Sequence, residues 1–287
     1  MSARLELHDG TEVTYRVLGE GVPVVGMPGG PGISSDYLSS FAEPLVDGLA
    51  WHLIDPPGTG GTTPATDYSI SGHADFYREV VSALGLGRVV VFGHSYSGTV
   101  ATTFAANYPE TTLGCLLVAP PVVGTGIDEA EGGGIRTAMN AAMARHQNQP
   151  WYEEAVEAAF NPDVGDIEAS LRKSLPLSFS DPTDDLLNRL LNTFAPFQIN
   201  MDPMMWFYEK EWPTLDLRPL INDLQCPLFA IVGEHDWEVP PIQARHYKEA
   251  TNGRVVEIAD CGHYVQVEAP TVYATAVKDW LHDSHLA

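Results

Sequence analysis

The sequence has few cysteines and few positive charges, and each shortage excludes a class of protein. Its three cysteines, Cys115, Cys226 and Cys261, lie far apart without metal-ligand spacing. This pattern favours free thiols in a reducing compartment over a disulfide framework or a metal site. Only 15 lysines and arginines stand against 38 aspartates and glutamates. The resulting net charge of −23 argues against nucleic acid or an anionic membrane surface as a partner.

Long apolar segments are also missing. No run approaches the ~18 apolar residues that a membrane-spanning helix needs, and residues 1–6 lack the apolar region of a secretory signal. We therefore expect a cytoplasmic protein with no membrane partner. The sequence also carries no motif for a cofactor or a metal, and it leaves the oligomeric state open.

What the chain does have is material for a large core, since 44% of its 287 residues are hydrophobic. Apolar, strand-like runs alternate with helical patterns, which predicts an α/β fold with a mostly parallel eight-stranded sheet and helices on both faces. The eight predicted strands are Arg4–His8, Glu12–Leu18, Val22–Met27, Trp51–Asp55, Val89–Phe92, Leu113–Ala119, Pro227–Val232 and Val255–Ile258.

The alternation stops after the sixth predicted strand, and the next hundred residues have only helical patterns. We interpret residues 122–222 as an inserted helical cap, and residues 1–121 and 223–287 as the core domain that carries it. The predicted core helices are His73–Leu84, Tyr96–Tyr108, Pro241–Thr251 and Pro270–His282, and the predicted cap helices are Ile135–His146, Trp151–Phe160, Asp166–Ser174 and Asp184–Phe194.

The most specific motif is the segment 93–98, Gly-His-Ser-Tyr-Ser-Gly, directly after the apolar run Val89–Phe92. A strand that ends in Gly-x-Ser-x-small and continues as a helix is typical of a nucleophile elbow, in which the serine sits on a tight turn above the sheet. Ser95 would be the nucleophile. An ordinary helix-capping serine gives the same letters, so the prediction depends on finding a base and an acid.

An acid and a base follow the last two predicted strands. Asp236 comes just after Leu228–Val232, at the carboxyl edge of the sheet where parallel α/β proteins place their sites. Glu234 and Glu238 compete with it for the same role, although a solvated loop carboxylate is the simpler interpretation of both. His263 follows the last strand and would be the base. The order Ser95, Asp236, His263 is the order of one particular fold among those with such a triad.

A Gly-Pro-rich loop after the third predicted strand could complete this site. Residues 28–32, Pro-Gly-Gly-Pro-Gly, are neither helical nor strand-like, and a plain turn is the alternative. Two N–H donors are needed to stabilise the charge that develops in acyl transfer. We predict that these are the backbone N–H groups of Gly30 and Tyr96, with Gly29 also contacting substrate. His94, beside the nucleophile, is expected to point into the fold.

Together these motifs resemble the α/β-hydrolase superfamily over the whole chain, and they are similar to the proline iminopeptidase group. The matching residues are the elbow around Ser95, the segment 233–236, Gly262-His263 with Glu268 and Pro270 downstream, and Gly29, Gly30, Pro31 and Gly32. Pro28 stands where that group has histidine, and Ser97 where it has glycine. The resemblance implies a cofactor-free serine hydrolase that forms an acyl-enzyme on Ser95.

The resemblance also implies a small-molecule or short-peptide substrate with a free amine. Acidic residues of the cap would bind this amine. The segment 204–212 could line such a pocket, with Trp206 and either Glu209 or Glu211 as candidates, although packing of the cap on the core is the alternative. Aminopeptidase-like amide cleavage is the leading hypothesis. A carboxylesterase or lactonase acting on a medium-sized apolar acyl group, a C–C bond hydrolase or cofactor-free lyase, and a non-catalytic binding protein are the alternatives.

Overall fold

The structure is a computed structural model that describes residues 2–163, 165–194 and 199–286. Its centre is one eight-stranded sheet with the strand order β1-β2-β4-β3-β5-β6-β7-β8. Strand β2 pairs antiparallel with both β1 and β4, and all other pairings are parallel, which confirms the predicted mostly parallel sheet. The strands are β1 Ala3–Glu6, β2 Glu12–Leu18, β3 Glu20–Met27, β4 Asp47–Ile54, β5 Val89–His94, β6 Thr112–Val118, β7 Leu228–Gly233 and β8 Gly253–Ile258.

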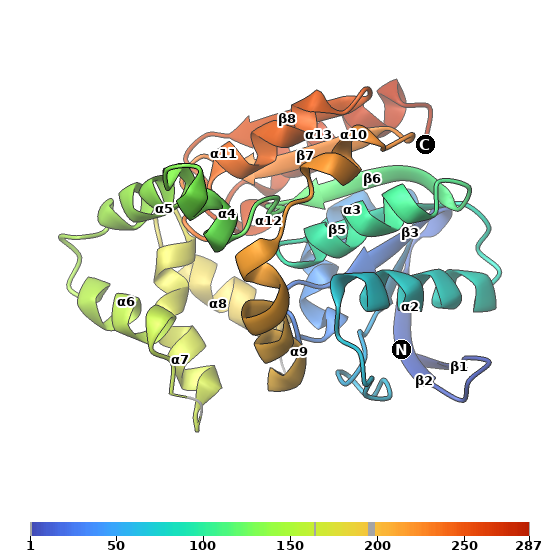
Figure 1. Cartoon of the computed structure of the whole chain (residues 1–287), viewed down its shortest axis with the longest axis horizontal. Helices are drawn as coiled ribbons and strands as arrows, with labels where there is room; N and C mark the ends of the chain where they lie inside the picture. The colour runs from blue at the N-terminus through green and yellow to red at the C-terminus, as the bar shows by residue number, and fades with distance from the viewer. Residues whose placement is uncertain (1, 164, 195–198, 287) are drawn as a thin grey trace.

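Helices lie on both faces of this sheet and at one end of it (Figure 1). None of the described helices has the length and apolar character needed to cross a membrane. The α-helices are α1 Ser39–Ala42, α2 Ile70–Ala83, α3 Ser97–Asn107, α4 Thr125–Ala130, α5 Gly134–Ala144, α6 Tyr152–Phe160, α7 Ile167–Ser174, α8 Asp184–Thr193, α9 Met201–Trp206, α10 Arg218–Asn222, α11 Pro241–Ala244, α12 Val265–Glu268 and α13 Pro270–Asp283.

The central strand β5 shows why the strand sequences are apolar throughout. Successive side chains of a strand point to opposite faces of the sheet. Val89 and Val91 belong to the core beneath α2 and α3, whereas Val90 and Phe92 belong to the core beneath α1 and α13. All six residues of β5 are buried. A strand covered on both faces has no position for a solvated polar side chain, so the site must lie at its end.

The region between β6 and β7 holds the helices α4 to α10. We call residues 122–222 the insertion. Figure 1 shows α5, α6, α7 and α8 gathered at one end of the molecule, beyond the sheet. The four predicted helices of this region occur within two residues of their predicted ends. Its treatment as a separate cap domain stays a prediction.

Two predicted core helices differ clearly from the structure at one boundary each. Helix α2 begins at Ile70, three residues before the predicted start, because the Ser69 side chain accepts a hydrogen bond from Gly72 N. The predicted helix Pro241–Thr251 is shorter in the structure. It is α-helical only to Ala244 and continues as a 3₁₀ segment, Arg245–Glu249. Helix α3 ends at Asn107, one residue before the predicted end at Tyr108 and two residues before Pro109.

Candidate active site

Ser95 occupies a strained turn between β5 and α3. Its φ of +56° is unusual for a residue with a side chain, and such strain persists only where the surroundings hold it. Ser95 N donates to Val118 O at 2.9 Å. At Gly93 a Cβ atom would lie 2.3 Å from Ser97 O, so glycine is required there for strand and helix to approach this closely. This is the geometry expected of a nucleophile elbow.

Ser97 stands where the proline iminopeptidase group has glycine, and its hydroxyl is hydrogen-bonded on both sides. Its hydroxyl donates to Met27 O at 2.5 Å and accepts from His94 N at 2.9 Å. The side chain is buried, and both partners lie at the carboxyl ends of strands. The serine therefore ties the turn after β5 to the end of β3, from which the Gly-Pro-rich loop departs.

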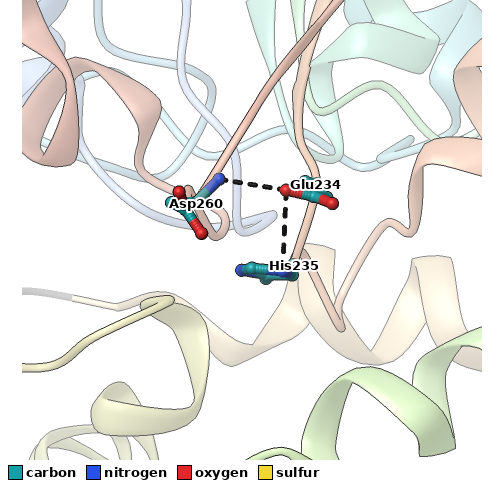
Figure 2. Close-up of side chains that lie close together, drawn as sticks. All are labelled: Glu234, His235 and Asp260. Atoms are coloured by element: carbon teal, nitrogen blue, oxygen red, sulfur yellow. Dashed lines mark hydrogen bonds and ion pairs between the residues drawn. The ribbon is translucent and has the colours of Figure 1, made fainter.

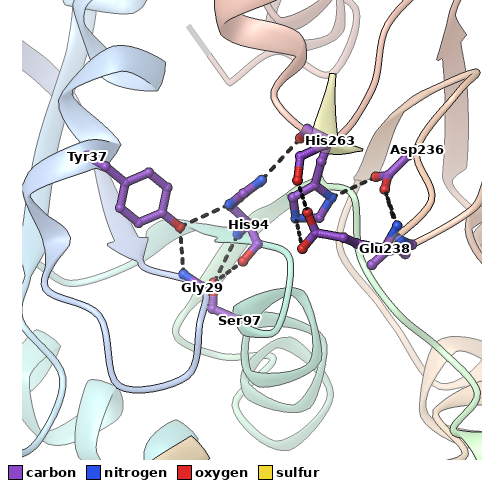
Figure 3. Close-up of polar contacts among 9 residues, drawn as sticks. Gly29, Tyr37, His94, Ser97, Asp236, Glu238 and His263 are labelled. Carbon is purple, nitrogen blue, oxygen red and sulfur yellow. Dashed lines mark hydrogen bonds and ion pairs between the residues drawn. The ribbon is translucent and has the colours of Figure 1, made fainter. Parts of the chain in front are cut away.

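Asp236 and His263, which the sequence selects as acid and base, lie in direct contact (Figure 3). His263 Nδ1 lies 2.8 Å from Asp236 Oδ2, and both side chains are almost completely buried. The other carboxylate oxygen, Oδ1, accepts from Glu238 N and Val239 N, each at 2.9 Å. These two backbone donors fix the carboxylate, and the carboxylate in turn fixes the imidazole with Nε2 directed away from Asp236.

Glu234, one of the two competing acids, lies elsewhere. Figure 2 shows its carboxylate directed at Asp260 and His235. It accepts from Asp260 N at 3.1 Å, and its Oε2 lies 3.6 Å from His235 Nε2. The three side chains offer possible metal-ligand atoms within 4.8 Å of one another, at the surface of the described part of the chain.

Glu238, the other competing acid, is part of the site in a different way. Its Oε2 lies 3.6 Å from His263 Nε2, on the side of the ring opposite Asp236 (Figure 3). Ser178 in the insertion donates to its Oε1 at 2.5 Å, and about two thirds of the side chain is buried. Glu238 is thus not the solvated loop carboxylate that the sequence favours. In the sequence, only its position two residues after Asp236 could have indicated this.

These two carboxylates control the charge of the imidazole. Burial lowers the pKa of His263, but attraction to Asp236 and Glu238 outweighs burial and raises the pKa to about 9. The imidazole is therefore mainly protonated at neutral pH. Among the described residues, no hydrogen bond joins His263 to the Ser95 hydroxyl. Such bonds often form only when substrate is bound.

A small pocket opens beside Ser95. It encloses about 370 Å³, part of it open to solvent. The backbone N–H groups of Gly30 and Tyr96 donate to no other group in the described part of the chain. Both residues line the pocket together with Ser95, which is a requirement for oxyanion donors. The remaining lining residues are Pro121, Phe207, Tyr208, Trp212, Glu238 and Val239.

The other predicted substrate residues lie differently. The N–H of Gly29 donates to Tyr37 Oη at 2.7 Å. Trp206 and Glu209 are not among the residues that line the pocket, and the Lys210 ammonium lies 3.6 Å from the centre of the Trp206 ring. Glu211 accepts from Ile70 N at the start of α2. The segment 204–212 does reach the pocket, but through Phe207, Tyr208 and Trp212. The substrate-binding roles of Trp206 and Glu209 stay predictions.

Glu268 joins the insertion to the loop that carries His263. Its carboxylate accepts from Gly262 N at 2.6 Å and from Ser180 N at 2.8 Å. We expect Glu268→Ala to lower the free energy of unfolding by roughly 2–4 kcal/mol, because it leaves two part-buried N–H groups unpaired. Urea unfolding would measure this. Burial raises the pKa of Glu268 to about 7, so the comparison belongs well above that pH.

Glu257→Ala is the control, since Glu257 is an exposed residue of β8. It should change the free energy of unfolding by less than about 0.5 kcal/mol. Equal stability of the two variants would show that the contacts of Glu268 contribute nothing.

Comparison with known proteins places this geometry in context. The family model described as "alpha/beta hydrolase fold" matches residues 22–270. Among curated proteins, a proline iminopeptidase of Saccharolobus solfataricus is 31% identical over 107 residues, which is 36% of this chain and 34% of that protein. The chain therefore matches only about a third of the length of this relative.

Solved structures agree over nearly the whole chain. An alpha/beta fold family hydrolase from Bacillus anthracis superposes with a TM-score of 0.77 at 18% identity, covering 98% of this chain and 99% of that one. A proline iminopeptidase from Mycobacterium smegmatis gives a TM-score of 0.72 at 20% identity, covering 100% and 99%. At these identities the likeness establishes the arrangement of helices and strands.

Proposed function

The chain belongs to the α/β-hydrolase fold family, and on this premise we propose that it is a serine hydrolase with Ser95 as nucleophile. The observation that carries the proposal is the buried pair of Asp236 and His263 on the loops after β7 and β8, at the same sheet edge as the strained turn of Ser95. A serine hydroxyl is a weak nucleophile until a positioned base removes its proton.

The reaction begins with attack of Ser95 Oγ on the substrate carbonyl carbon. His263 Nε2 takes the hydroxyl proton as the C–O bond forms, and Asp236 stabilises the resulting imidazolium through Nδ1–H. The proton then passes to the leaving amine or alcohol, whose bond to the carbonyl carbon breaks. Water, deprotonated by the same imidazole, hydrolyses the acyl-enzyme and regenerates Ser95.

The negative charge of each tetrahedral intermediate needs donors that are already in place. Gly30 and Tyr96 line the same pocket as Ser95, and their free N–H groups are suited to this role. Tyr96 N lies at the start of α3, where the helix dipole adds a favourable potential for an anion. Each donor of this kind contributes about 3 kcal/mol to lowering the barrier.

For the substrate, we favour an amide or ester with a free amine next to the scissile carbonyl. Glu238 supports this choice, because its carboxylate lines the pocket beside Ser95 and lies 3.6 Å from the nitrogen of the base. An ammonium group bound there would be paired with a part-buried negative charge. It would also offset the attraction of Glu238 for the imidazolium, and so favour the neutral imidazole that the reaction needs.

The test is hydrolysis of prolyl and alanyl arylamides, each beside its N-acetylated form and a simple aryl ester. Cleavage of the free-amine compounds that is lost on acetylation supports an aminopeptidase. Cleavage of the ester alone contradicts the peptidase assignment and leaves a working serine hydrolase.

Carboxylesterase or lactonase activity is the second candidate. Three aromatic side chains, Phe207, Tyr208 and Trp212, line the pocket and give it an apolar wall suited to a medium-sized acyl group. This candidate predicts that ester hydrolysis does not depend on a free amine.

A Glu238→Gln substitution separates the two candidates. We expect it to lower kcat/KM for a free-amine substrate by about 10- to 100-fold, the effect of losing one charge-assisted hydrogen bond. The same variant should change kcat/KM for a neutral aryl ester by less than about threefold at alkaline pH, where the imidazole of both enzymes is neutral. Glu257→Gln is the control, because Glu257 is an exposed residue of β8 and does not line the pocket. Equal loss on both substrate classes would contradict amine recognition by Glu238.

The pH dependence gives a further prediction. Since attraction to Asp236 and Glu238 raises the pKa of His263 to about 9, kcat/KM for a neutral ester should increase with pH up to about 9. Removing the negative charge of Glu238 lowers this pKa. The acid limb of the pH profile of Glu238→Gln should therefore move to lower pH. An acid limb that stays at the same pH, or moves to higher pH, would contradict the electrostatic coupling between Glu238 and His263.

A further inference from the structure

A chain of three buried hydrogen bonds connects the Gly-Pro-rich loop with the catalytic histidine (Figure 3). Gly29 N donates to Tyr37 Oη at 2.7 Å, and Tyr37 Oη lies 2.9 Å from His94 Nδ1. His94 Nε2 lies 3.3 Å from His263 O. Tyr37 and His94 are each 2% exposed. The reaction described above uses neither side chain.

Only one assignment of protons satisfies this chain. Gly29 N can only donate and His263 O can only accept. The Tyr37 hydroxyl must therefore accept from Gly29 and donate to His94 Nδ1, which leaves Nε2–H to donate to His263 O. In the other neutral tautomer of His94, the hydroxyl hydrogen of Tyr37 would have no acceptor. A lone pair on His94 Nε2 would also face a lone pair on His263 O. In every one of these hydrogen bonds the donor therefore lies on the side of the Gly-Pro-rich loop and the acceptor on the side of His263.

Neither side chain changes its charge near neutral pH. Burial lowers the pKa of His94 well below the ordinary value, and repulsion from His263, whose ring centre is 4.8 Å away, lowers it further. Burial raises the pKa of Tyr37 far above neutrality. The chain of hydrogen bonds therefore stays intact when His263 accepts and releases its proton.

Both ends of this chain lie next to catalytic groups. The peptide after Gly29 carries the N–H of Gly30, the predicted oxyanion donor. A Cβ atom at Gly29 would lie 2.7 Å from His94 O and 3.2 Å from Tyr37 Oη, so the loop packs directly on the elbow. At the other end, His263 O accepts from His94, and His263 N donates to Ser178 O at 2.7 Å. The backbone of His263 is thus held on both sides.

We propose that Tyr37 and His94 are positioning residues that fix the Gly-Pro-rich loop and the His263 backbone relative to each other around Ser95. The proposal rests on the serine-hydrolase function proposed above. It requires that the two residues matter for the transition state, in which both the oxyanion donors and the base must be in place, and much less for substrate binding.

The test is Tyr37→Phe beside Tyr273→Phe. Tyr273 is also a fully buried tyrosine of the same core, but its hydroxyl donates only to Phe41 O, at 3.3 Å. With aryl ester as substrate and active sites counted by fluorophosphonate titration, Tyr37→Phe should lower kcat by about 10- to 100-fold. Its KM should change less than about threefold, as expected when a contact acts only in the transition state. Tyr273→Phe should stay within about threefold of wild type in both constants.

A spectroscopic measurement distinguishes positioning from a general loss of structure. The proton between His263 and Asp236 should give a low-field NMR resonance in the wild type. We expect this resonance to shift or broaden in Tyr37→Phe and to stay in place in Tyr273→Phe. An unchanged resonance together with an unchanged kcat per active site in Tyr37→Phe would overturn the proposal, and so would equal effects in both variants.

The outcome for the wild type separates the two proposals. A wild type that hydrolyses no ester or amide and takes up no fluorophosphonate would contradict the serine-hydrolase function, and the resonance alone would then test the role of Tyr37. An active wild type with an unaffected Tyr37→Phe variant would contradict only the positioning role.

Discussion

Ser95→Ala is expected to lower kcat by about 10⁶-fold on any ester or amide that the wild type hydrolyses, while leaving the fold intact. The substitution removes the atom that forms the acyl bond. Alanine has the same difficulty as serine with the φ of +56° at this position, so the strain of the turn changes little. In the described part of the chain the Ser95 hydroxyl has no hydrogen bond that the substitution would break.

Steady-state kinetics and thermal unfolding would test this together. Ser82→Ala, at an exposed position of α2, is the control and should behave as wild type. Acid quenching during turnover should trap one acyl group on Ser95 of the wild type and none on Ser95→Ala. A folded Ser95→Ala variant with substantial activity would end the nucleophile assignment.

Asp236→Asn should be the next most damaging change, with a loss of about 10⁴-fold in kcat. The reason lies in the two backbone donors at Oδ1, Glu238 N and Val239 N, which will hold the amide oxygen of asparagine. The amide NH₂ must then face His263 Nδ1. It can only donate there, so the imidazole takes the tautomer with Nε2–H, which cannot accept the proton of Ser95.

Glu234→Gln is the matched control for this prediction, because Glu234 follows the same strand but contacts Asp260 and His235. It should retain kcat within about threefold. The reverse result, a severe loss in Glu234→Gln and a mild one in Asp236→Asn, would transfer the orienting role to the other carboxylate.

The sheet and the positions of Ser95, Asp236 and His263 could be predicted because their signals are local. A buried parallel strand must be apolar throughout, and a residue just after it lies at the carboxyl edge wherever the strand sits in the sheet. Three loop residues at three strand ends are thereby brought to one edge without knowledge of any side-chain contact. The roles of the three residues remain proposals.

Glu238 and Tyr37 could not be assigned in this way. Glu238 matters because its side chain turns toward Nε2 of His263 and is held there by Ser178, which comes from the insertion. Tyr37 matters because its hydroxyl meets both Gly29 and His94. Ser178 lies 60 residues from Glu238, and Tyr37 lies 57 residues from His94, so no periodicity in the sequence reveals these two contacts.

The pocket wall shows a third kind of difficulty. The sequence suggests Trp206 and Glu209, three residues apart, whereas Phe207, Tyr208 and Trp212 line the pocket. Residues Phe207–Glu211 form a π-helical turn. Such a turn has a wider repeat than the α-helix, so it changes which residues share a face, and the sequence does not reveal where that change occurs.

The central claim is that Ser95 is the activated nucleophile of this site, and covalent labelling tests it most directly. The purified protein would be treated with a fluorophosphonate, and its intact mass and labelled peptide determined. We predict one adduct per chain, on the peptide that contains Ser95, and none in Ser95→Ala. No adduct on the folded wild type, or an adduct on a different residue, would contradict the claim.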